Sequence, residues 1–92
     1  MNKTNALLNR ADALYDEGQE QFNHSDFRGA IEKWEEALSI FLKLGEKKAR
    51  GEALNNLGNA YKNLGDYPKA ISSYEKALAI AEIGRASCRE RV

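Results

Sequence analysis

The sequence predicts an all-α fold made of two tandem antiparallel helix pairs. Hydrophobic residues recur at helical spacing along most of the 92-residue chain, and no segment alternates with the period of two that marks a β-strand. The chain also repeats itself after 40 residues: ten identities relate 14–40 to 54–80, where chance would supply roughly two. A fixed period of this size indicates stacked helix pairs, as in a fragment of an α-solenoid.

The first helix pair is expected within residues 1–45, with helices near Lys3–Asn23 and Asp26–Leu44 and a turn at His24. Ser25 or Asp26 can cap the second helix, since both residue types accept hydrogen bonds from free backbone N–H groups. Apolar and small residues form one stripe on each helix, at the spacing that faces a partner helix. These residues are Leu7, Ala11, Leu14 and Gly18, followed by Phe27, Ala30, Ile31, Trp34, Ala37, Leu38 and Phe41.

The second helix pair is expected within residues 46–82, after a turn at Gly45, with helices near Lys47–Leu64 and Tyr67–Ala81. Gly65 can adopt the left-handed conformation that ends a helix, and Asp66 can cap the next one. Pro68 suits the first turn of that helix, where its missing N–H costs nothing. The apolar stripes are Leu54, Leu57, Gly58, Tyr61 and Leu64, and then Tyr67, Ala70, Ile71, Tyr74, Ala77, Leu78 and Ala81.

These stripes predict both the core and an uncovered edge. The predicted core consists of Leu14, Ala30, Ile31, Trp34, Leu38, Leu54, Leu57, Tyr61, Ala70, Tyr74 and Leu78. In a stack of helix pairs each pair is covered by the next, and the last helix here has no following neighbour in the sequence. We therefore expect an exposed apolar edge at Ile71, Leu78 and Ile80, and self-association through this uncapped C-terminal helix.

The second helix pair resembles a tetratricopeptide repeat. The resemblance rests on Leu57-Gly58, Tyr61, Gly65-Asp66-Tyr67, Ala70-Ile71, Tyr74 and Ala77-Leu78. The first pair matches less fully, because Glu17 and Gln21 replace the usual apolar residues. The period of 40 exceeds the family's usual 34, which suggests a lengthened second helix, and the motif's final proline is absent from both repeats.

The resemblance implies a protein-interaction module whose first helices line a concave, peptide-binding groove. The groove residues would be Asn55, Asn56, Asn59, Lys62 and Asn63, together with Tyr15, Gln19 and Phe22 of the first repeat. Asparagine is a mediocre helix former, but its amide both donates and accepts hydrogen bonds and can bind a peptide backbone of any sequence. The alternative is that these asparagines only keep an exposed helix soluble. The two-carboxylate clamp of chaperone-binding members is not matched, because Tyr15 stands where a basic residue would be required.

The leading functional hypothesis is a non-enzymatic scaffold that binds a peptide or a partner domain on its concave face. The alternative is a regulatory repeat array fused to an enzyme domain, because Ile40–Gly51 resembles arrays that precede a CHAT-type protease. We expect no cofactor and no metal, since His24 lacks a second histidine or a nearby cysteine. Nucleic-acid and membrane partners are not expected either, because there is no basic stripe and no membrane-spanning apolar run, and we expect a cytoplasmic protein.

Residues 83–92 are interpreted as a non-native tail. One permitted back-translation of Ile83–Val92, ATC GGA AGA GCG TCG TGT AGG GAA AGA GTG, matches a common sequencing adapter read in one frame. The tail holds three of the 14 basic residues, one of the 14 acidic residues and the one cysteine, Cys88. Without it, 11 basic and 13 acidic residues remain, a net charge of about −2. We expect the natural chain to continue beyond Ala81 and the tail to pack poorly.

Overall fold

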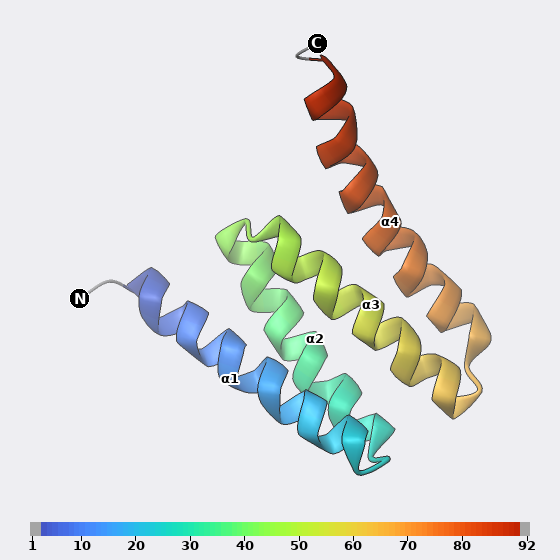
Figure 1. Ribbon diagram of the computed structural model, residues 1–92. Helices are drawn as coiled ribbons and strands as arrows, with labels where there is room; N and C mark the ends of the chain where they lie inside the picture. Colours follow the sequence, from blue (N-terminus) through green and yellow to red (C-terminus); the bar gives the residue numbers. More distant parts are fainter. Residues whose placement is uncertain (1–2, 91–92) are drawn as a thin grey trace.

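Four helices follow one another in the computed structural model, which describes the backbone of residues 3–90 and the side chains of residues 5–80. They are α1 (Lys3–Asn23), α2 (Phe27–Leu44), α3 (Lys47–Leu64) and α4 (Tyr67–Glu90). Each helix packs antiparallel against the next, so that α2 and α3 occupy the middle of the stack (Figure 1). No β-strand occurs within residues 3–90, and the predicted all-α fold of antiparallel helix pairs is confirmed.

The turns form where the sequence predicts them. Gly45 and Gly65 both adopt the left-handed conformation, with φ of 71° and 85°, and thereby end α2 and α3. Asp26 is the N-cap of α2, and its Oδ1 accepts a hydrogen bond from the Gly29 N–H at 3.1 Å. Ser25 is left-handed as well, with φ of 66°, although it carries a side chain. It stands 40 residues before Gly65, so both helix pairs turn with the same backbone geometry.

The last helix is longer than predicted. We expected it to end near Ala81, but α4 continues to Glu90. The sequence beyond Ala81 contains no proline, the residue that most strongly interrupts a helix, and Gly84 lies within α4 and does not end it. The expectation that residues 83–92 pack poorly concerns side chains outside the described part of the chain.

Trp34 on α2 is the centre of the core. Its side chain is 1% exposed, and its indole N–H donates to the backbone carbonyl of Tyr15 on α1 at 3.0 Å. The indole lies directly against Gly18, where a Cβ atom would come within 2.5 Å of Trp34 Nε1. Tyr74 covers Gly58 in the same way in the second pair, because a Cβ atom added at Gly58 would lie only 2.6 Å from Tyr74 Cε1. The two glycines therefore occupy equivalent places, as the repeat predicts.

Most of the predicted core residues are buried, but Leu78 is not. Its side chain is 57% exposed, so its assignment to the core was wrong; Leu38, Tyr61 and Tyr74 are only half-buried. The reason is that α3 covers α2, whereas no described helix covers the equivalent side of α4. Buried residues outside the predicted list are mostly alanines at helix contacts: Ala11, Ala37, Ile40, Phe41, Ala53, Ala60, Ser73 and Ala77.

The uncovered side of α4 is most evident when the two repeats are compared. Ile31 on α2 is 8% exposed, whereas Ile71, its counterpart on α4, is 56% exposed. The predicted apolar edge is thus confirmed at Ile71 and Leu78. It is not found at Ile80, which is half-buried and packs against the core.

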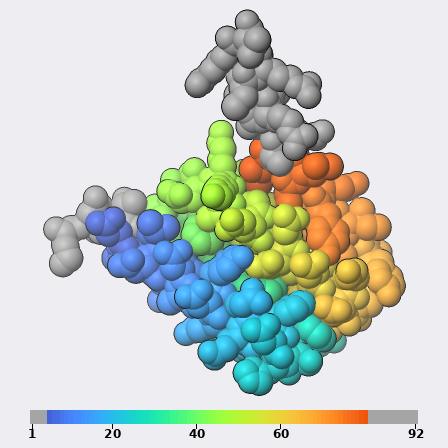
Figure 2. Space-filling model, in the orientation of Figure 1, coloured from blue at the N-terminus to red at the C-terminus, as the bar shows by residue number. Residues whose placement is uncertain are grey.

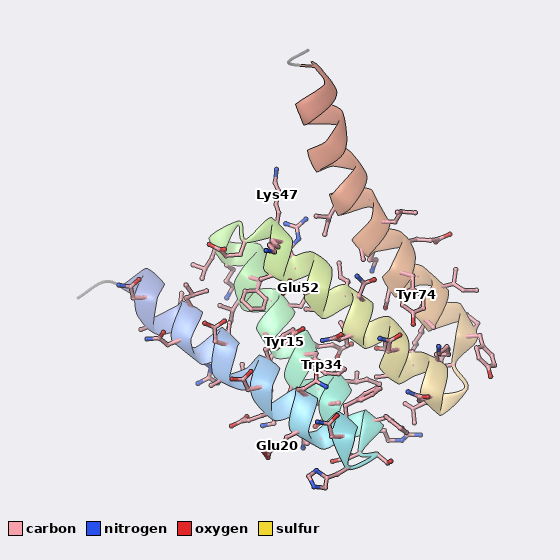
Figure 3. The ribbon with its side chains drawn as sticks, viewed as in Figure 1. Tyr15, Glu20, Trp34, Lys47, Glu52 and Tyr74 are labelled. Atoms are coloured by element: carbon pink, nitrogen blue, oxygen red, sulfur yellow. The ribbon has the colours of Figure 1, made fainter. Side chains whose placement is uncertain are left out.

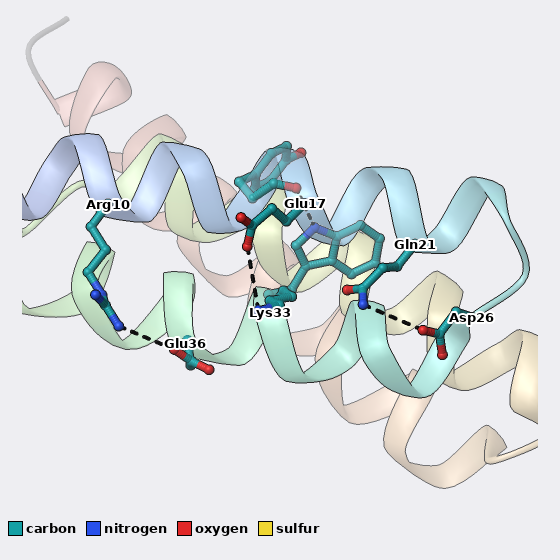
Figure 4. A network of polar contacts seen from close by, with 8 residues as sticks. Arg10, Glu17, Gln21, Asp26, Lys33 and Glu36 are labelled. Carbon is teal, nitrogen blue, oxygen red and sulfur yellow. Dashed lines mark hydrogen bonds and ion pairs between the residues drawn. The ribbon is translucent and has the colours of Figure 1, made fainter.

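Polar contacts line the outer seam between α1 and α2 (Figure 4). Glu17 pairs with Lys33 at 3.5 Å, and the Gln21 side-chain amide donates to Asp26 at 3.5 Å. These contacts explain why polar residues replace the expected apolar pair at Glu17 and Gln21. Exposed pairs of this kind contribute at most about 1 kcal/mol each, so the indole of Trp34 and its neighbours hold the first pair together.

Candidate functional site

The predicted groove residues come from α1 and α3, which lie on one face of the molecule (Figure 2). Asn56 on α3 joins the two helices, because its side-chain N–H donates to the hydroxyl of Tyr15 on α1 at 2.6 Å. The two residues are 41 positions apart in the sequence, so only the packing of the helices brings them together. Figure 3 shows Tyr15 between these helices, together with Glu52 on α3.

The Tyr15 hydroxyl is held in its protonated form. Burial raises its pKa above the ordinary value of 10.0, and the nearby carboxylates of Glu52 and Asp16 raise it further, while the hydrogen bond from Asn56 opposes them. Because the oxygen accepts from Asn56, its own proton points elsewhere, and no acceptor for it is found among the described side chains. A hydroxyl in this state can donate to a ligand oxygen.

Other predicted groove residues are occupied by contacts within their own helix pair. Asn59 accepts a hydrogen bond from the Tyr74 hydroxyl of α4, which fixes its amide. Phe22 packs edge-on against Phe27 and tilted against Trp34, with ring centroids 5.2 and 5.7 Å apart. Phe22 therefore closes the end of the first helix pair, and its ring is only partly available to a ligand.

The remaining predicted groove residues are exposed polar side chains. Asn55, Lys62 and Asn63 on α3 face solvent. Gln19 on α1 is also exposed and donates weakly to Asn23 at 3.4 Å. The face thus combines exposed amides with the hydrogen-bonded Tyr15–Asn56 pair, and two carboxylates, Asp16 and Glu52, stand beside that pair.

Sequence reasoning missed a second surface, which lies between α2 and α4. Tyr61 was assigned to the core, but its hydroxyl reaches Glu35 of α2 at 2.9 Å and the ammonium of Lys69 lies 5.7 Å from its ring centroid. These residues line a hollow of about 690 Å³ together with Arg28, Glu32 and Asp66. The repeat pattern alone could not reveal it, because the hollow depends on the spacing of two helices from different repeats.

The described residues show no arrangement typical of metal chemistry or of a membrane span. No three histidine, cysteine or carboxylate side chains among them are grouped to hold a metal ion. None of the helices, within the part that the structure describes, combines the length and the apolar character needed to cross a bilayer.

Comparison with known proteins identifies the second helix pair. The tetratricopeptide-repeat family model matches residues 51–82, which comprise most of α3 and the first part of α4. No curated protein matches the chain. The matched segment contains Gly58 and Tyr74, the close helix contact that also occurs between Gly18 and Trp34 in the first pair. Residues 51–82 are therefore similar to a tetratricopeptide repeat, and the fold of the first helix pair is consistent with a second such unit.

Proposed function

We propose that this protein is an interaction module that binds an extended segment of a partner protein across the α1/α3 face. The hydrogen bond from Asn56 to Tyr15 carries the proposal, since it joins the two helices into one rigid surface. An extended peptide exposes backbone N–H and C=O groups in alternation. The amides of Asn55, Asn63 and Gln19 can satisfy both kinds of group, and Tyr15 can donate its proton to a carbonyl oxygen.

Preorganisation makes such a surface effective. Each side chain that is immobilised on binding costs about 0.5–1.5 kcal/mol of conformational entropy. Asn56 is already held by Tyr15, and Asn59 is already held by Tyr74. Two of the asparagines therefore lose little freedom when a ligand binds.

A displayed library of random peptides, selected against the full chain, tests this proposal. Replacing Asn55 and Asn63 together by alanine should weaken the selected peptides about tenfold, since two hydrogen bonds of roughly 0.5–1.5 kcal/mol each are lost. The matched control replaces Ser39 and Ser72, exposed residues of α2 and α4, by alanine and should leave affinity unchanged. If the peptides bind the serine variant more weakly but bind the asparagine variant as tightly as the parent protein, they bind the other face. Unchanged affinity in the asparagine variant would support the alternative that these residues serve solubility alone.

The alternative of a regulatory array fused to an enzyme domain stays a prediction. No contact among residues 5–80 bears on a domain outside this sequence.

A further inference from the structure

A continuous groove runs between α2 and α4, on the side of the molecule away from Tyr15 and Asn56. Three hollows of about 690, 160 and 390 Å³ follow one another along it. Neighbouring hollows share wall residues: first Glu35, Tyr61 and Lys69, and then Leu38, Leu54 and Lys76. The groove exists because α2 and α4 each pack against α3, which forms its floor. From Pro68 to Ile80 it extends roughly 18 Å along α4, at about 1.5 Å per residue.

One end of the groove is apolar. Leu38 and Leu42 of α2, Leu54 of α3, and Ala79 and Ile80 of α4 line the hollow of about 390 Å³. Leu42 is 60% exposed at its rim, so the packing of this chain makes little use of its side chain. Exposed leucines that continue a buried apolar floor are characteristic of surfaces that bind another apolar group.

The same end is positively charged. Arg50 and Lys76 line the apolar hollow, and neither forms an ion pair with a described side chain. The acidic residues of the groove, such as Glu35, lie toward its other end, and Glu35 is already engaged by the Tyr61 hydroxyl. Lys69 in that region pairs with Asp66 at 3.8 Å. A complementary partner would therefore place carboxylates next to apolar side chains.

We propose that the α2/α4 groove binds an acidic amphipathic helix of a partner protein. Its apolar residues would enter the hollow between Leu38, Leu42 and Ile80, and its carboxylates would meet Arg50 and Lys76. A helix fits because the groove runs along two helices for about three helical turns, and anchors one turn apart lie on one helix face. A small amphiphilic anion would fill only the apolar hollow. This site uses a different face from the α1/α3 surface and does not depend on the function proposed above.

Two designed peptides of about 16 residues test the proposal, since isolated helices of this length are marginally stable in water. Both carry leucines on one helical face; one has glutamates beside the leucines and the other has lysines. Fluorescence anisotropy with the full chain should show about tenfold tighter binding of the glutamate peptide, as expected when charge-assisted contacts form. Lys76→Glu should reverse this preference, and Leu42→Gln should weaken both peptides several-fold.

The matched control is Lys43→Glu, which makes the same charge change at an exposed residue of α2 that lines none of the three hollows and should leave both affinities unchanged. Circular dichroism verifies that each variant is folded. Three results would overturn the proposal: equal binding of the two peptides, an equal effect of Lys43→Glu and Lys76→Glu, or Lys76-dependent binding of decanoate without binding of the glutamate peptide. The last result would identify the groove as a site for a lipid anion.

Discussion

Two glycines of the same helix should respond in opposite ways to replacement by alanine. Gly51 and Gly58 both lie inside α3, two turns apart. A Cβ atom added at Gly51 meets no atom within 4 Å. At Gly58 the same atom would lie 2.6 Å from Tyr74 Cε1 and 2.8 Å from two further ring atoms. Comparison of the two variants therefore separates the effect of alanine's helix propensity from the effect of steric contacts with the added methyl group.

The expected magnitudes follow from these contacts. Alanine is favoured over glycine inside a helix by roughly 0.5–1 kcal/mol, so Gly51→Ala should stabilise the protein by about that amount. At Gly58 the same gain is opposed by overpacking, which costs about 1–3 kcal/mol. Displacement of the Tyr74 ring would also break its hydrogen bond to Asn59, at a further cost of about 0.5–1.5 kcal/mol. Gly58→Ala should therefore lose about 1–3 kcal/mol overall.

Urea unfolding followed by far-ultraviolet circular dichroism measures both free energies of unfolding. The double variant should show additive effects, because the two sites share no contacts. Gly18→Ala should behave like Gly58→Ala, since its Cβ would lie 2.5 Å from Trp34 Nε1. If Gly58→Ala stabilises the protein as much as Gly51→Ala, the space next to Tyr74 is open and the helix pair does not pack as described.

Three further predictions follow from other parts of the structure. Burial, the hydrogen bond to Glu35 and nearby carboxylates raise the pKa of Tyr61 from 10.0 to about 12, so the folded protein keeps a proton that the unfolded chain loses near pH 10. Stability should therefore be full below pH 10 and fall as the pH rises toward 12; urea midpoints should show this fall, and Tyr61→Phe should reduce it. Ser25→Gly should stabilise the protein by about 0.5–1 kcal/mol in the same assay, because glycine adopts the left-handed conformation of this turn without steric cost; a loss would mean that the serine side chain is required there. The exposed apolar edge of α4 should cause self-association in sedimentation experiments, and Ile71→Glu with Leu78→Glu should abolish it without loss of helix content; a parent protein that is monomeric at high concentration would contradict this expectation.

The helices and turns were predictable from the sequence because their signals are local. The apolar spacing defined each helix, Asp26 marked the start of α2, and Gly65 marked the end of α3. The 40-residue repeat also predicted that Gly18 and Gly58 would occupy equivalent places, since identical residues at a fixed spacing adopt the same packing. At the candidate site, the repeat and the family resemblance assigned Tyr15 and Asn56 to one face.

Burial and the contacts between repeats were decided only by the tertiary structure. Leu38 and Leu78 occupy the same position in their repeats, yet α3 covers the first, while no described helix covers the second. The hydrogen bond between Tyr15 and Asn56 and the groove between α2 and α4 likewise depend on how one helix pair is placed on the other. A periodic pattern determines which side of a helix is apolar. It does not determine which neighbour covers that side, because that neighbour comes from a distant part of the chain or from another molecule.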